Sequence, residues 1–177
     1  MGTGYTLQCR KCGYEISADL GVGFFFPRAY QQAMKAGRAG KLGKKIKQFL
    51  REHPDGALDV ENVFLQCPEC GMLEKGPDLS MYVRNPDVPR REKGIWSVAA
   101  PFEDVDYVSP MELKEEQTYT LYAPGHICEK CGKPMKSITD NELMRSRFDK
   151  EKETDRTEVS CPECGDLLWI AEIGMWD

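Results

Sequence analysis

The spacing of the cysteines constrains this chain more than any other feature. All eight cysteines fall into four Cys-x-x-Cys-Gly elements, at residues 9–13, 67–71, 128–132 and 161–165. Two elements of this kind supply the four thiolates of one tetrahedral metal site, so four elements predict two sites. The predicted metal ligands are Cys9, Cys12, Cys67, Cys70, Cys128, Cys131, Cys161 and Cys164.

Each element carries the residues that a tight turn around a metal ion requires. The glycine after the second cysteine suits a backbone position with positive φ, which other residues adopt only with strain. Pro68 and Pro162 follow the first cysteine in two of the elements and fix φ for the turn. A single Cys-x-x-Cys pair is also typical of a redox dithiol or a disulfide, but four copies with a glycine each favour metal binding.

An internal repeat indicates which elements share a metal ion. Residues 63–73 align with residues 157–167, since both contain a strand-like segment followed by Cys-Pro-Glu-Cys-Gly and a leucine. Each half of the chain therefore contains, in this order, a cysteine element, an insert, a strand, a second cysteine element and a second strand. On this basis we expect the first element to pair with the second and the third with the fourth.

This pairing predicts an α+β fold made of two four-cysteine β units with inserted helices. The first unit spans residues 1–84 and carries a basic helical insert at 27–52. Residues 85–117, rich in proline and charge at their start, form a linker with short strands. The second unit spans residues 118–177 and carries a charged helical insert at 140–152.

Local signals place the helices and strands within this division. Proline at position 27 opens a helix that ends near Gly37, and a second helix covers residues 41–52. Capping boxes begin helices at Ser109 and Thr139, because each is followed three residues later by a glutamate. Short strands are expected at residues 5–9, 14–16, 95–98, 105–108, 119–122 and 167–170.

The amino-acid composition limits the size of the apolar core and bears on the cellular compartment. Charged residues make up 30% of the 177 residues, so neither half has the apolar content of a large core, and metal supplies what a small core cannot. Reduced, metal-ready thiols indicate a cytoplasmic setting. No secretory signal precedes Cys9 and no apolar run approaches the length of a membrane helix, so we expect no membrane association.

One segment is strongly basic in an otherwise acidic chain. Residues 28–51 hold eight of the 24 basic residues and no acidic residue, which leaves 16 basic against 29 acidic residues elsewhere. Such a segment is either a solvated helix face, a contact surface for nucleic acid or another polyanion, or a contact surface for a protein partner. The polyanion-binding candidates are Arg38, Lys41, Lys44, Lys45, Lys47 and Arg51.

Catalytic motifs are missing from the sequence. It contains no His-Glu-x-x-His, Gly-x-Ser-x-Gly or dinucleotide-binding pattern, and the basic segment lacks P-loop spacing. A site closed by four thiolates also has no open position for water or substrate. We therefore predict no catalytic residue and no hydrolytic zinc chemistry; the sequence favours a protein that is not an enzyme but leaves that question open. His126 is expected to be a loop residue, because the cysteines already complete two sites.

The two predicted β units resemble zinc ribbons, in which Cys-Pro-Glu-Cys-Gly is a common second knuckle. The 29 residues between Cys131 and Cys161 are also similar in number to the spacing of rubredoxins, which hold one iron ion on four cysteines. The first 80 residues or so resemble a group of uncharacterised bacterial zinc-ribbon proteins through residues 5–15 and 20–27. The resemblance implies zinc-ribbon or rubredoxin-like β units in a bacterial protein.

The sequence thus supports a leading hypothesis and two alternatives. The leading hypothesis is a binding or adaptor module in which two Zn²⁺ ions hold the shape and the basic helices contact nucleic acid or a protein. The first alternative is a rubredoxin-like iron (Fe) protein that carries single electrons. The second is a thiol oxidoreductase that uses free Cys-x-x-Cys pairs and folds without metal.

Overall fold

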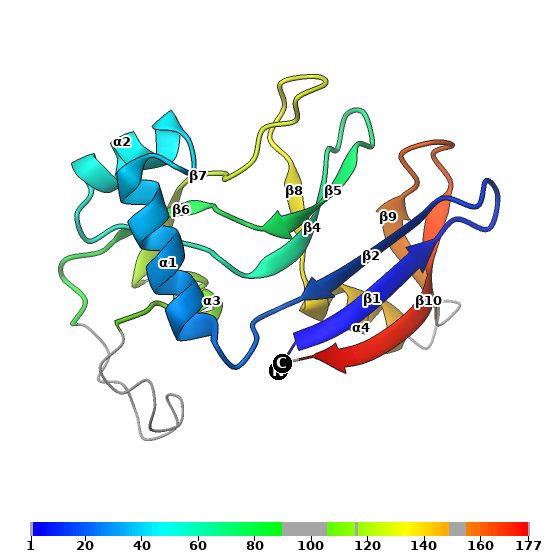
Figure 1. The fold of residues 1–177 in the computed structure, drawn as a ribbon, viewed down its shortest axis with the longest axis horizontal. Helices are drawn as coiled ribbons and strands as arrows, with labels where there is room; N and C mark the ends of the chain where they lie inside the picture. The colour runs from blue at the N-terminus through cyan, green and yellow to red at the C-terminus, as the bar shows by residue number, and fades with distance from the viewer. Residues whose placement is uncertain (1, 90–105, 116, 149–154, 177) are drawn as a thin grey trace. The chain divides into compact units, whose positions relative to one another are not determined.

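A computed structural model describes residues 2–89, 106–115, 117–148 and 155–176 of the chain (Figure 1). These residues form four helices and three antiparallel sheets, compatible with the predicted α+β class. The chain divides into two compact units. Unit 1 combines residues 1–23, 61–78 and 126–177, and unit 2 combines residues 24–60 and 79–125.

The larger sheet of unit 1 is made of two hairpins, each with a cysteine element at its turn. Its strands are β1 (Gly2–Gln8), β2 (Glu15–Leu20), β9 (Arg156–Ser160) and β10 (Leu167–Trp176). The strand order is β2-β1-β10-β9, so the first and last strands of the chain form its centre. β1 and β10 pair from Gly2 opposite Trp176 to Gln8 opposite Trp169, and Figure 1 shows them side by side.

A second sheet of unit 1 has the order β5-β4-β8. Its strands are β4 (Asn62–Gln66), β5 (Leu73–Pro77) and β8 (Lys136–Ile138). An antiparallel bridge between Gly21 and Asn62 joins it to the end of β2. The two sheets share one apolar core, in which Tyr5 and Leu7 of β1 are buried with Phe64 of β4 and Ile138 of β8. Both hairpin systems are therefore parts of one packed body.

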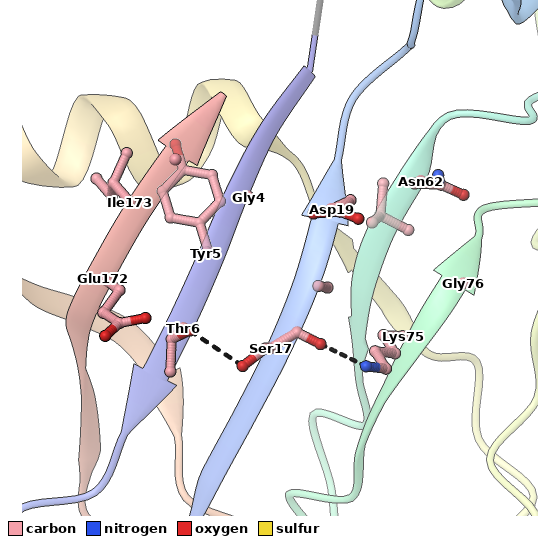
Figure 2. Close-up of a pocket in the computed structure, with 13 residues that line it drawn as sticks. Gly4, Tyr5, Thr6, Ser17, Asp19, Asn62, Lys75, Gly76, Glu172 and Ile173 are labelled. Atoms are coloured by element: carbon pink, nitrogen blue, oxygen red, sulfur yellow. Dashed lines mark hydrogen bonds between the residues drawn. The ribbon is translucent and has the colours of Figure 1, made fainter. Parts of the chain in front are cut away.

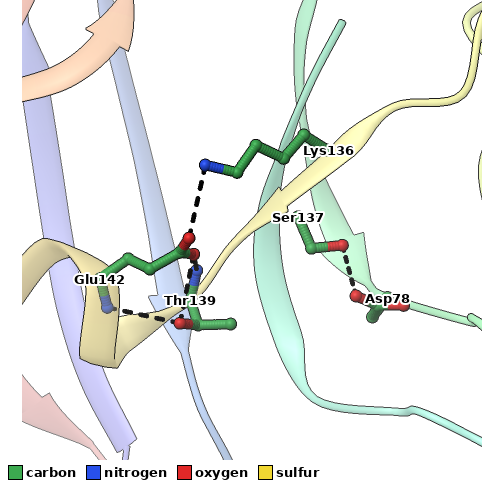
Figure 3. A network of polar contacts seen from close by, with 5 residues as sticks. All are labelled: Asp78, Lys136, Ser137, Thr139 and Glu142. Carbon is green, nitrogen blue, oxygen red and sulfur yellow. Dashed lines mark hydrogen bonds and ion pairs between the residues drawn. The ribbon is translucent and has the colours of Figure 1, made fainter. Parts of the chain in front are cut away.

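Helix α4 (Asp140–Phe148) belongs to unit 1 and begins with the predicted capping box. The backbone N–H of Thr139 donates to the Glu142 carboxylate at 2.8 Å, and the N–H of Glu142 donates to Oγ1 of Thr139 at 3.4 Å (Figure 3). Lys136 of β8 lies 3.5 Å from the Glu142 carboxylate, and Ser137 donates to the Asp78 carboxylate. The ion pair of Lys136 with Glu142 thus connects α4 to the second sheet.

Unit 2 contains the remaining helices and one sheet of order β3-β6-β7. The helices are α1 (Phe26–Ala39), α2 (Lys44–Glu52) and α3 (Pro110–Leu113). The strands are β3 (Ala57–Leu58), β6 (Met81–Arg84) and β7 (Tyr119–Ala123). The predicted capping box of α3 is present, because Ser109 and Glu112 each accept a hydrogen bond from the other's backbone N–H.

Helix α1 continues beyond Gly37, where the sequence predicted its end. Gly40 ends it instead, with φ of 83° in the left-handed region that favours glycine. Gly37 serves packing, because a Cβ atom there would lie 2.8 Å from Cδ1 of Leu50 and 3.0 Å from Cγ2 of Ile46. The missing side chain lets α2 approach α1 closely.

Other predictions for the linker have mixed outcomes. A strand over residues 119–122 is confirmed by β7, whereas residues 106–108 are not in a strand. The strand expected at 95–98 lies outside the described residues. The predicted domains 1–84, 85–117 and 118–177 are each contiguous in the sequence. Each of the two compact units instead contains residues from both halves of the chain.

Candidate metal centres

The eight cysteines gather into two sets of four, both in unit 1. Site A consists of Cys9, Cys12, Cys161 and Cys164, and site B consists of Cys67, Cys70, Cys128 and Cys131. Within each set all four sulfur atoms lie within 4.8 Å of one another. Each site could therefore hold one metal ion.

The predicted pairing of the elements is wrong. The first element pairs with the fourth and the second with the third, so one pair is nested inside the other along the chain. The repeat on which the prediction rested describes a single hairpin, which recurs as β4–β5 and β9–β10. Which hairpins meet is decided by the long-range ladders β1–β10 and β4–β8, and the repeat carries no signal for these.

All four elements have the same backbone geometry. The N–H of the glycine donates to the carbonyl of the first cysteine, at 2.9 Å for Gly13, 3.0 Å for Gly71, 2.8 Å for Gly132 and 2.9 Å for Gly165. The N–H of the first cysteine donates to the carbonyl five residues later, at distances between 2.7 and 2.9 Å. The glycines have φ values between 71° and 80°, as their position after each turn predicted.

The distances between sulfur atoms fit a tetrahedral ion. In site A, Cys9 lies 3.5 Å from Cys164 and Cys12 lies 3.5 Å from Cys161. In site B the distances are 3.3 Å from Cys67 to Cys131 and 3.5 Å from Cys70 to Cys128. Four sulfurs bound to zinc at about 2.3 Å lie about 3.8 Å apart, whereas a disulfide requires about 2.05 Å. All eight cysteines are free of disulfides.

The electrostatics of each site favour a cation. The backbone N–H of Cys12 lowers the pKa of Cys9 to about 7, and the N–H of Cys70 lowers that of Cys67 to about 6. The backbone N–H of Tyr14 acts to lower the pKa of Cys12, but desolvation and three neighbouring thiols together outweigh it and raise this pKa to about 12. Four thiolates so close together repel one another, and a bound dication removes that repulsion.

The two sites have the same order of burial of their cysteines but differ in the residues beside the sulfur atoms. In each element the first cysteine is buried and the second is half-buried or exposed. Beside site A, the guanidinium of Arg10 lies 3.5 Å from the centre of the Trp169 ring. In site B, Sγ of Cys128 lies 3.7 Å from Sδ of Met72. His126 is outside both sets, and its Nε2 donates to the carbonyl oxygen of Pro77 at 2.9 Å.

The basic segment lies on a different unit from the cysteines. Its eight cationic side chains are all exposed, on α1, on α2 and on the turn between them. Arg51 pairs with Glu52 at 3.7 Å, and Nζ of Lys45 donates to the carbonyl of Pro124 at 3.4 Å. Of the six polyanion-binding candidates, only Arg51 forms an ion pair with another described residue.

Two hollows of the structure were not predicted, because each is formed by segments far apart in the chain. A groove of about 820 Å³ in unit 1 crosses β10, β1, β2, β4 and β5, and Figure 2 shows Thr6, Ser17 and Lys75 along it. Three of its polar residues contact one another, since the hydroxyls of Thr6 and Ser17 lie 3.0 Å apart and Lys75 donates to the Ser17 carbonyl. No cysteine lines this groove.

The second hollow, of about 900 Å³, lies in unit 2. Lys35 and Arg38 of α1 line it together with Asp106, Glu112 and Glu115. Lys35 and Arg38 thus face a surface of mixed charge, while the cations of α2 are outside this hollow. This separates Arg38 from the other five polyanion-binding candidates.

Comparison with other proteins adds no further assignment: no family model, curated protein or solved structure matches the chain. Among the described helices, none combines the length and the apolar character needed to cross a membrane.

Proposed function

We propose that the protein is a binding module in which two structural Zn²⁺ ions hold unit 1 and the basic helices of unit 2 contact a polyanion. The observation that carries the metal part is the closed set of four cysteines at each site. Structural zinc sites are typically tetrahedral with four protein ligands, whereas catalytic sites keep one position open. The support is for a structural metal, because each set of four already completes the coordination.

The contact surface is proposed from the charge of α2 and the turn before it. Lys41, Lys44 and Lys47 are exposed and make no ion pair with a described residue. A surface of unpaired cations neutralises phosphates and releases the counterions around a nucleic acid. Nucleic acid or another polyanion in the cytoplasm is therefore the proposed partner.

The distribution of charge between the units supports this division of roles. Unit 2 contains 13 basic and 11 acidic residues, for a net charge of +2, while unit 1 contains 11 basic and 18 acidic residues, for −7. An acidic metal-binding unit repels polyanions and leaves α2 as the attractive surface. We expect binding to be local and strongly dependent on salt.

Elemental analysis of protein purified without added metal, with an absorption spectrum of the same sample, tests the metal assignment. Two zinc ions per chain and no visible absorption are expected. Iron with visible charge-transfer bands would contradict the zinc assignment and identify the second candidate, a rubredoxin-like one-electron carrier. That candidate is retained because the four-thiolate geometry of both sites suits iron as well as zinc.

A gel-shift titration at several salt concentrations tests the contact surface. The variant Lys44→Gln/Lys47→Gln removes two cations from α2, and Lys136→Gln/Arg145→Gln removes two exposed cations from unit 1, outside the cysteine elements, as a matched control. The α2 variant should reduce the salt slope by about one per lost phosphate contact, with little change in the control. Absence of binding at low salt would refute the polyanion contact and leave a protein partner as the explanation.

A further inference from the structure

An aromatic cluster lies beside the cations of α2. The rings of Phe49, His53 and Tyr122 are mutually close, with centroid distances of 5.1 Å for Phe49–His53, 5.1 Å for Phe49–Tyr122 and 5.2 Å for His53–Tyr122. Phe49 is buried and His53 is half-buried, whereas Tyr122 is 51% exposed. The cluster therefore supports one ring that remains open to solvent.

The helix and the strand both aim side chains at this cluster. Lys45 and Phe49 are four residues apart on one face of α2, and His53 is the residue that directly follows the helix. Tyr122 is the extra residue of a β-bulge in β7, because the ladder passes from Met81–Ala123 to Tyr82–Leu121 and skips it. A bulge redirects the side chain of its extra residue, and such bulges are frequent next to functional sites.

Positive charge adjoins the open ring. Nζ of Lys45 donates to the carbonyl of Pro124, two residues after Tyr122, so this ammonium group lies at the end of β7. Lys44, Lys47 and Arg51 are exposed on the same short helix, on the side opposite Phe49. A partner that places a planar group on Tyr122 would therefore meet Lys45 beside the ring and reach the other cations by extending over α2.

Single-stranded nucleic acid combines those two properties. Its unpaired bases have free faces that stack on aromatic side chains, and its phosphates follow a basic surface. The bases of a duplex are already stacked, and inorganic polyphosphate or an acidic peptide lacks the regularly spaced bases. The cluster distinguishes these ligands where charge alone does not.

We propose that Tyr122, supported by Phe49 and His53, is a base-stacking platform for single-stranded nucleic acid held by the cations of α2. This inference rests on the proposed polyanion contact and narrows it to one class of ligand. It adds a residue of β7 to a contact surface that the sequence placed only on residues 28–51.

Fluorescence anisotropy with a labelled single-stranded oligonucleotide of about 12 nucleotides, within the usual site size, tests the proposal. Tyr122→Ala should weaken binding by about 5- to 150-fold, the usual effect of removing one stacking residue. Tyr122→Phe keeps the ring and should bind like the wild type. Leu121→Ala is the matched control, because Leu121 is 55% exposed on the same strand but outside the cluster.

Binding of inorganic polyphosphate distinguishes the stacking platform from the polyanion contact on which it rests. We expect polyphosphate to bind the wild type and Tyr122→Ala equally, since it has no bases. If neither polyphosphate nor the oligonucleotide binds the wild type, the polyanion contact itself is refuted. If both bind and Tyr122→Ala leaves the oligonucleotide affinity unchanged, only the stacking platform is refuted.

A measurement on the wild type covers the case in which Tyr122→Ala fails to fold. An oligonucleotide that carries the fluorescent base 2-aminopurine reports stacking directly, because its emission is quenched when the base stacks. Quenching on binding that is smaller in a folded Tyr122→Leu variant is the expected result. Binding with unchanged 2-aminopurine emission would overturn the proposal.

Discussion

Removing one cysteine from each of two elements distinguishes the nested pairing from pairing within each half. Cys12 and Cys164 belong to site A, whereas Cys70 belongs to site B. These three are also the more accessible cysteines of their elements, so serine at these positions disturbs the core least. The informative variants are Cys12→Ser/Cys164→Ser and Cys12→Ser/Cys70→Ser.

The expected effects follow from which sulfur atoms share an ion. Cys12→Ser/Cys164→Ser damages only site A, so site B should retain one ion per chain. Cys12→Ser/Cys70→Ser damages both sites and should retain none. A structural zinc contributes about 10–16 kcal/mol, as much as the about 5–15 kcal/mol stability of a whole domain. Site A contributes Cys9 and Cys161 to one apolar cluster of unit 1, and site B contributes Cys67 and Cys128 to another. Because the second variant disrupts both clusters, it should also lose its cooperative unfolding transition.

Zinc content after dialysis, together with urea unfolding followed by circular dichroism, measures both effects. The single variants Cys12→Ser, Cys164→Ser and Cys70→Ser are the controls, and each should lose one ion. Pairing within the halves predicts the reverse order, since Cys12 and Cys70 would then share a site. Retention of one ion by Cys12→Ser/Cys70→Ser, with loss of both by Cys12→Ser/Cys164→Ser, would refute the nested arrangement.

Three further predictions concern packing, a polar link and acid. Gly37→Ala places a methyl group 2.8 Å from Cδ1 of Leu50. Overpacking of this kind costs about 1–3 kcal/mol, which outweighs the gain of about 1 kcal/mol in helix propensity. The midpoint of urea unfolding should therefore fall. Gln66→Ala removes two hydrogen bonds with the backbone of Ser160, in which Nε2 donates at 2.7 Å and Oε1 accepts at 3.2 Å, and a third from Nε2 to the Gly71 carbonyl at 3.5 Å. It should destabilise the protein by about 1–3 kcal/mol, whereas Gln8→Ala, at the exposed position before Cys9, should change stability little in the same urea assay. Acidification from about pH 7.5 to about pH 5 should release metal, because protons compete for the thiolates, and zinc released into a colorimetric chelator measures this.

Sequence analysis predicted those features whose partners lie close together in the chain. The capping boxes at Ser109 and Thr139 are confirmed because each glutamate is only three residues away. The turn around each pair of cysteines is likewise closed by hydrogen bonds within five residues. For such features the residue types and their spacing contain all the necessary information.

The features that sequence analysis missed depend on distant segments. A glycine inside a helical pattern marks either the end of the helix or a place where another element packs closely against it. Only the position of Leu50 shows that Gly37 allows close packing. Tyr122 is an ordinary strand residue by pattern, and the bulge that turns it toward α2 appears only in the ladder with β6. The pairing of hairpins from opposite ends of the chain also depends on distant segments, and local patterns therefore did not predict it.

Loop closure explains why sequence distance was a poor guide to the pairing. Pairing within the first half would enclose the 54 residues between Cys12 and Cys67, whereas the nested pairing encloses the 148 residues between Cys12 and Cys161. Because the entropic cost grows only with the logarithm of loop length, the longer loop costs about 1 kcal/mol more. The ladder of β1 with β10 runs the full length of β1, and Tyr5 and Leu7 are buried in the core beneath it. Burying one such side chain contributes about 1.5–3 kcal/mol, so the long-range pairing outweighs the longer loop.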